Sequence, residues 1–148
     1  MYKYQTEIEA LNECKIECPP GELYSFVGIL YRFVHPVDCK ENVKNNLPVC
    51  KINPKRQLKG DDEKCIAHAS LSCFDSDKQA QQFILDKSLV NKKIYKSVGC
   101  CIGEFQISEK DGARTDSAEN GHFSFFEYEG TDLNNKYTIK RELTKCNP

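Results

Sequence analysis

The run ELYSFVGILYRFVH, from Glu22 to His35, constrains the fold most, because it is dense in aromatic and β-branched residues and almost continuously apolar. This composition is typical of a central strand that is covered on both faces. Gly28 interrupts the run, so we expect a strand that bends at that point. A chain of 148 residues can bury one core around such a strand. We therefore expect a single domain over residues 1–148.

Two segments have the pattern of amphipathic helices. The first runs from Tyr4 to Cys14, where apolar residues recur at helical spacing among Glu and Gln. The second runs from Asp77 to about Val90, and Ser76 and Gln79 form a capping-box signature at its start. Its apolar residues are expected to form a buried stripe of Ala80, Phe83, Ile84 and Leu89.

The other periodic segments indicate strands. Residues Cys65 to Phe74 alternate with period two, Ile94 to Ile107 forms one or two strands, and residues 121–130 form another. Tyr137 to Leu143 alternates again and carries basic residues, which favours an edge strand. Pro36 to Asp62 is rich in turn residues, so we expect a long surface loop. The pattern predicts an α+β fold, with a mixed or mainly antiparallel sheet and about two packed helices.

The charge balance excludes some partners. The chain has 21 basic and 22 acidic residues and a net charge of −1, so no overall field attracts nucleic acid or anionic lipid. No apolar run approaches the roughly 20 residues of a membrane-spanning helix. The first 14 residues lack the apolar core of a signal peptide. We therefore expect a cytoplasmic protein that binds neither nucleic acid nor membrane.

Cysteine usage points the same way. Nine cysteines cannot all pair, and several, such as Cys73, Cys100 and Cys101, lie in apolar, strand-like segments where a free thiol behaves as a small hydrophobe. We expect most of them to be reduced. Cys14 and Cys18 are the only close pair outside the vicinal one, and no second pair completes a tetrahedral zinc shell. We expect no metal.

Three short motifs occur in a suggestive order. Arg32 lies in the first apolar run, Ser-Leu-Ser at 70–72 leads into the second helix, and Glu-Tyr-Glu stands at 127–129. This order resembles the ADP-ribosyltransferase fold, whose arginine-type members carry an Arg on an early strand, a Ser-x-Ser strand running into a helix, and a Glu-x-Glu near a later strand. The resemblance implies NAD as the cofactor.

The resemblance also implies a role for each motif residue. Arg32 would hold the NAD phosphates, because Arg pairs bidentately with phosphate, and Ser70 and Ser72 would shape the nicotinamide pocket. Glu129 would stabilise the oxocarbenium-like ribose, with Glu127 on the same face of the strand. The same residues also fit a solvated strand face whose charges keep an edge soluble.

A second pattern uses two of the three histidines. His68 and Ser70 form one His-x-Ser pair, and His122 and Ser124 form another. The pattern is similar to the two-histidine phosphoesterases, where one His acts as general base and the other as general acid on a shared phosphate. Both histidines could instead be structural residues of their strands.

A non-catalytic interaction module is the third alternative. Such a module, for example a small subunit or a neutralising protein partner, needs an exposed apolar patch rather than a convergent polar site. The sequence offers a group of aromatic residues for this purpose: Phe123, Phe125, Phe126, Tyr128 and Tyr137.

Overall fold

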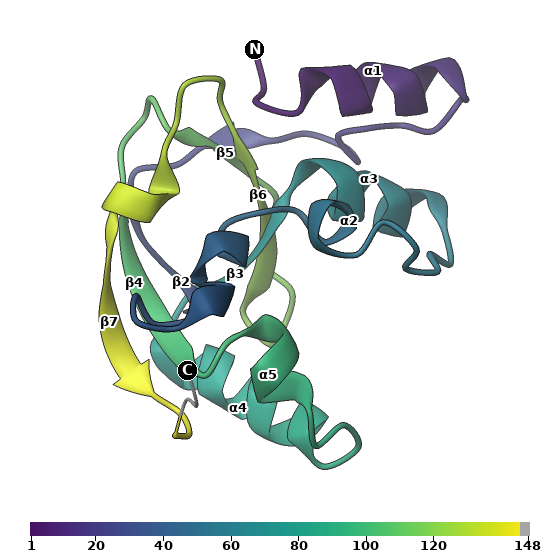
Figure 1. The fold of residues 1–148 in the computed structure, drawn as a ribbon. Coiled ribbons are helices and arrows are strands. Elements are labelled where there is room, and N and C mark those ends of the chain that lie inside the picture. Colours follow the sequence, from purple (N-terminus) through teal and green to yellow (C-terminus); the bar gives the residue numbers. More distant parts are fainter. Residues whose placement is uncertain (146–148) are drawn as a thin grey trace.

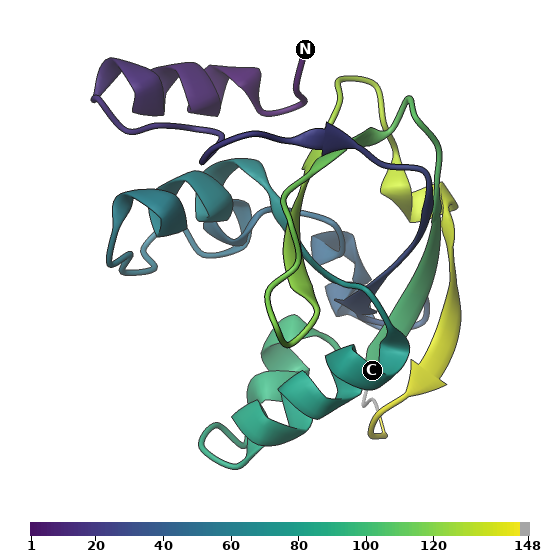
Figure 2. The same ribbon diagram turned by 180° about the vertical axis from the view of Figure 1, so that it is seen from behind.

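The computed structural model describes residues 1–145, and they fold around one seven-stranded sheet in the order β1-β5-β6-β3-β2-β4-β7. Every pairing between neighbouring strands is antiparallel. The sheet curls strongly, as Figures 1 and 2 show from opposite sides. The strands are β1 (Tyr24–Ser25), β2 (Gly28–Val34), β3 (Leu71–Phe74), β4 (Cys101–Ile107), β5 (Gly112–Arg114), β6 (His122–Glu127) and β7 (Tyr137–Glu142).

The helices form two groups beside this sheet. Helices α1 and α2 each contact α3, and α4 contacts α5 at the opposite end of the molecule (Figure 1). None of the helices within residues 1–145 is long and apolar enough to cross a membrane. The helices are α1 (Gln5–Glu13), α2 (Val49–Ile52), α3 (Asp61–Ala69), α4 (Asp77–Ser88) and α5 (Ile94–Val98), with 3-10 turns η1 (Lys40–Lys44) and η2 (Leu133–Asn135).

The α+β class and the antiparallel sheet are confirmed, and so are both predicted helices. In α4, Ser76 Oγ accepts a hydrogen bond from the Gln79 backbone at 3.1 Å, which confirms the cap. The terminal strand β7 lies at an edge, as expected. Leu89, however, is 80% exposed and lies outside the buried stripe.

Three segments differ from expectation. The first half of the predicted strand Cys65–Phe74 is helix α3, because its acidic first turn (Asp61, Asp62 and Glu63) complements a helix dipole and outweighs the alternating pattern. The expected strand at Ile94 begins instead with α5. The predicted loop from Pro36 to Asp62 contains η1 and α2, so the chain has more helices than the two expected.

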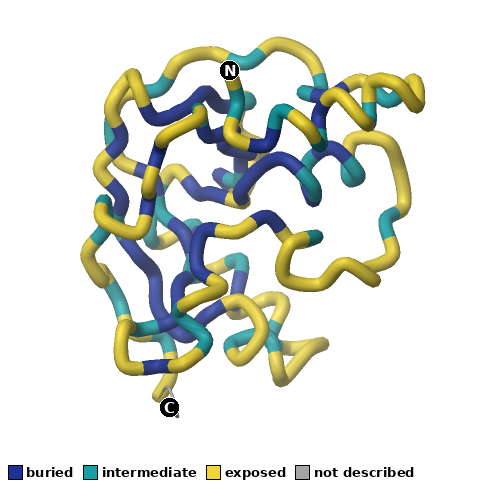
Figure 3. Tube along the Cα trace, turned by 45° about the horizontal axis from the view of Figure 1, so that its top comes forward, coloured by how far each residue is buried: buried dark blue, intermediate teal, exposed yellow. Residues whose placement is uncertain are grey.

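Buried residues form three clusters around the sheet. Figure 3 shows the buried segments of the chain in dark blue. The largest cluster includes Leu30, Phe105 and Phe125 from neighbouring regions of the curled sheet. A second cluster joins α1 and α3 to β6, and a third joins α4 to β2, β3 and β4. Thus α3 packs on β6, one neighbour of β3, whereas α4 packs on β3 itself and on its other neighbour, β2.

A disulfide between Cys18 and Cys65 ties the segment after α1 to α3. Cys100 is disulfide-bonded as well. Five cysteines within residues 1–145 are free, which agrees with the expectation that most of the nine are reduced. Cys100, which was expected to be a free thiol in an apolar strand, is not, and Cys18 is no longer a candidate zinc ligand. Sequence spacing could not reveal the pairing, because residues 18 and 65 meet only when α1 packs on α3. The free thiols among residues 1–145 are Cys14, Cys39, Cys50, Cys73 and Cys101.

Replacing Cys18 and Cys65 together by Ala should lower the free energy of unfolding by about 2–4 kcal/mol, because the cross-link closes a long loop in the unfolded chain. Their separation is 47 residues. Urea denaturation under oxidising conditions measures the change, and Cys14→Ala, at an exposed free thiol, is the control. Equal midpoints for the double variant and the control would contradict the cross-link.

Candidate functional site

The two central strands β2 and β3 part immediately after they meet. Their only paired residues are Tyr31 and Phe74. Beyond this pair the guanidinium of Arg32 takes the place of the backbone ladder, since its Nη1 donates a hydrogen bond to the Ser72 carbonyl at 2.5 Å. A charged side chain therefore bridges a gap in the middle of the sheet.

Asn45 satisfies the backbone of His35, the residue that directly follows β2. Its Oδ1 accepts a hydrogen bond from the His35 amide at 2.8 Å, and its Nδ2 donates to the His35 carbonyl at 2.8 Å. These two bonds imitate a strand pairing. Asn45 is only 6% exposed, which contradicts the expectation of a solvated loop here.

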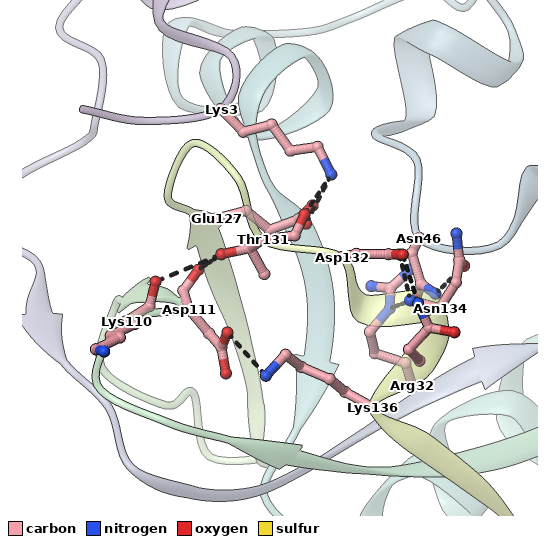
Figure 4. Close-up of polar contacts among 11 residues, drawn as sticks. Lys3, Arg32, Asn46, Lys110, Asp111, Glu127, Thr131, Asp132, Asn134 and Lys136 are labelled. Carbon is pink, nitrogen blue, oxygen red and sulfur yellow. Dashed lines mark hydrogen bonds and ion pairs between the residues drawn. The ribbon is translucent and has the colours of Figure 1, made fainter.

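Asn46 holds the guanidinium itself. Arg32 Nε donates to Asn46 Oδ1 at 3.1 Å, and Asn46 Nδ2 donates to Asn134 Oδ1 at 2.8 Å (Figure 4). Asn46 has a φ of 61°, a left-handed conformation that Asn tolerates better than most residues. Its amide thereby links β2 to η2.

A cavity of about 370 Å³ lies at the gap between the two strands. Arg32, Ser70 and Ser72 all line it, so the structure brings together three residues of the predicted site. Burial lowers the pKa of His35, another lining residue, which favours its neutral form. The remaining lining residues come from β2, from the segment before and after α2, from α2 and α3, and from α5 and its flanks: Phe33, Lys44, Asn45, Asn46, Leu47, Val49, Ile52, Asn53, Arg56, Ile66, Asn91, Ile94, Ser97 and Val98.

The two serines contribute differently to the cavity. Ser70 is buried, and its Oγ donates to the Ile66 carbonyl at 2.9 Å. Ser72 is exposed toward solvent, so its hydroxyl is the more accessible one. A larger cavity of about 430 Å³ lies on the other side of α5 and shares the His35 wall, but it contains none of the predicted site residues.

The strands that carry the three motifs are neighbours, in the order β6-β3-β2. Glu127 ends β6 and is 2% exposed. Burial raises the pKa of its carboxyl group, while the positive charges of Lys3 and Arg32 lower it by less. Glu127 thus lies within electrostatic range of Arg32, although it does not line the cavity.

The N-terminal residues cover Glu127 from outside. Lys3 Nζ lies 3.2 Å from Glu127 Oε2 and donates to the Thr131 carbonyl at 2.9 Å (Figure 4). The other carboxylate oxygen, Oε1, is buried and has no hydrogen-bond partner within residues 1–145. An orphaned buried acceptor of this kind is costly and is often retained for function.

Glu129 does not share this environment. The strand β6 ends at Glu127, and Glu129 lies in the following turn with an exposed side chain. Its backbone amide donates to the Met1 carbonyl. The expectation that Glu127 and Glu129 point to the same face of one strand is therefore wrong.

The chain matches no known family model, no curated protein and no solved structure at a significant level. The site is therefore interpreted from its own geometry.

The two predicted catalytic histidines lie in different environments. His68 belongs to α3, where its Nδ1 donates to the Lys64 carbonyl at 2.8 Å and lies 3.7 Å from the Cys50 thiol. Since that nitrogen carries a proton, it cannot accept one from Cys50. His122 packs against Phe74 and Phe83, and burial lowers the pKa of its imidazole. The premise that His68 and Ser70 share a strand face is wrong.

The aromatic residues expected to form an exposed patch are largely in the core. Phe123, Phe125 and Phe126 are each at most 1% exposed, so they offer no surface to a partner. A protein partner stays a prediction. Over residues 1–145, no group of three or more His, Cys, Asp or Glu side chains is placed to hold a metal ion.

The sequence reading missed the asparagine pair and His35 as site residues. An Asn-Asn doublet is an ordinary turn signal, and nothing in its sequence context indicates that its amides replace a strand pairing. His35 is the last residue of the apolar run from Glu22 and stands directly before Pro36, which marks it only as the end of a strand. Their role depends on the gap between β2 and β3, which only the fold reveals.

Asn46→Gly should lower the free energy of unfolding by about 1–3 kcal/mol, because glycine keeps the left-handed backbone but leaves the buried Nε of Arg32 without its acceptor. Urea denaturation measures this loss. Lys15→Gly is the matched control, since Lys15 has a φ of 65° and is exposed. A control as destabilised as the Asn46 variant would contradict the amide's role.

The difference in unfolding free energy between Glu127→Gln and the wild type should shift in favour of the variant as pH rises above about 4.5, the ordinary pKa of this group. The raised pKa means that the folded wild type binds more protons than the unfolded chain in this range, so its stability falls as pH rises. Gln does not titrate and avoids that loss. Melting temperatures measured across pH test this, with Glu129→Gln as the exposed control; parallel curves for all three proteins would argue against it.

Proposed function

We propose that the domain binds NAD in the cavity between β2 and β3 and transfers its ADP-ribosyl group to an acceptor or to water. The observation that carries this proposal is that Arg32, Ser70 and Ser72 line one cavity. Arg32 lies on β2, Ser72 lies on the adjacent strand β3, and Ser70 directly precedes β3. The next strand, β6, ends at Glu127. This is the set of residue types that the ADP-ribosyltransferase resemblance requires.

The cavity has the chemistry of a nucleotide site. Its volume of about 370 Å³ lies within the usual range for small-molecule pockets. Arg32 donates hydrogen bonds to oxygen acceptors through Nε and Nη1, and its guanidinium also interacts with the Cys73 thiol. A phosphate oxygen would pair with the remaining N–H groups of the guanidinium. Apolar side chains from α2 and α5 offer surface to a planar base, and the Ser72 hydroxyl can bond a carboxamide.

The proposed reaction breaks the bond between ribose C1′ and the nicotinamide nitrogen, and the electron pair leaves with nicotinamide. Water or an acceptor nucleophile then attacks C1′ and loses its proton. A carboxylate is suited to stabilise the positive charge that develops on the ribose. Glu127 is our candidate rather than Glu129, because it lies in electrostatic range of Arg32, and it must move toward the cavity to act.

We also propose that the domain works in an oxidising compartment. The expectation of a cytoplasmic location relied on the lack of a signal-peptide pattern and of a membrane-spanning run, and on the reduced thiols that pointed the same way. The Cys18–Cys65 disulfide supports the opposite location, because structural disulfides persist mainly outside the cytosol.

Purified oxidised protein should bind NAD and release nicotinamide, which calorimetry and chromatography measure. Ser72→Ala should weaken NAD binding several-fold without unfolding the protein. Glu127→Gln should slow nicotinamide release by about 100-fold or more and change binding little, whereas Glu129→Gln should resemble the wild type. Absence of NAD binding at millimolar concentration would contradict the proposal, and binding without release would identify a non-catalytic NAD-binding module.

A further inference from the structure

The cavity between β2 and β3 is positively charged. Three basic side chains line it, and no Asp or Glu within residues 1–145 does: the basic residues are Arg32, Lys44 and Arg56. His35 adds no charge near neutral pH, because burial lowers its pKa. A ligand that gains from this wall must itself be an anion.

The three cations occupy different parts of the wall. Arg32 is 8% exposed and comes from β2. Lys44 ends η1, and Arg56 follows α2, so both belong to the segment around α2 and are exposed. Val49 and Ile52 of α2 lie between these two in sequence and are each partly exposed on the same wall. The cavity therefore has an inner cation, an apolar surface and an outer pair of cations.

Only one of the outer cations is unpaired. Lys44 Nζ lies 2.7 Å from Glu41 Oε2, which offsets part of its charge. Arg56 has no ion-pair partner within residues 1–145. The guanidinium of Arg56 is thus the outer group best able to pair with a ligand, and guanidinium suits phosphate in particular.

We propose that Arg56, assisted by Lys44, forms an outer phosphate subsite, so that the cavity selects nucleotides with at least two phosphates over those with one. Arg32 holds one phosphate group at the inner end and Arg56 holds the next at the opening, while the base lies on the apolar side chains of α2 and α5. This inference deepens the proposed NAD site and rests on it for the position of the inner phosphate.

The test compares ADP with AMP as probes, using calorimetry at fixed ionic strength. Wild-type protein should bind ADP at least fivefold more tightly than AMP. Arg56→Gln should weaken ADP binding about tenfold or more, the usual effect of losing one charge-assisted hydrogen bond, and should change AMP binding less than twofold. Arg56 is exposed, so the variant should fold normally.

Lys55→Gln is the matched control, because Lys55 neighbours Arg56, is exposed and does not line the cavity. It should leave both affinities unchanged. Equal losses of ADP affinity in the two variants would overturn the subsite, as would a wild-type protein that binds neither nucleotide at millimolar concentration. ADP binding that depends on Arg56, without any NAD binding, would support the subsite and refute the proposed function. NAD binding that is unaffected by Arg56→Gln would support the proposed function and refute the subsite.

Discussion

The structure depends on how the chain closes a gap in the centre of its own sheet. Strands β2 and β3 share one residue pair, and a buried strand with unpaired backbone groups would be costly. Arg32 and Asn45 supply the missing hydrogen bonds from their side chains. The cavity depends on this replacement of backbone hydrogen bonds by side-chain hydrogen bonds, because a continuous ladder would leave no space between the strands.

The same arrangement makes the centre of the sheet unusually dependent on side-chain identity. In most sheets a central strand tolerates exchange among apolar residues of similar size, because its backbone bonds are unaffected. Here the guanidinium of Arg32 bonds both the Ser72 carbonyl and the Asn46 amide oxygen. Lys cannot reproduce that planar geometry. A group that could bind a ligand is therefore also a structural element.

The sequence predicted the fold class, α1, α4 with its cap, and the edge position of β7, because each leaves a local pattern. It also identified Arg32, Ser70 and Ser72, which do share a cavity. It misjudged α3, since Cys65 and Ala69 fit a strand period of two but are also four residues apart, which places them on one helix face. The cavity's other essential residues could not be found, because the Asn45 and Asn46 amides act across sequence distances that only the assembled sheet sets.

The disulfide between Cys18 and Cys65 reaches further than the helix pair that it joins. Cys65 directly precedes Ile66, which lines the cavity and whose carbonyl accepts the Ser70 hydroxyl bond. Protein produced in a reducing host would lack the cross-link that anchors this wall. A ligand screen on such material would report on the loosened helix rather than on the native cavity, so the redox history of the sample is part of the chemistry of the site.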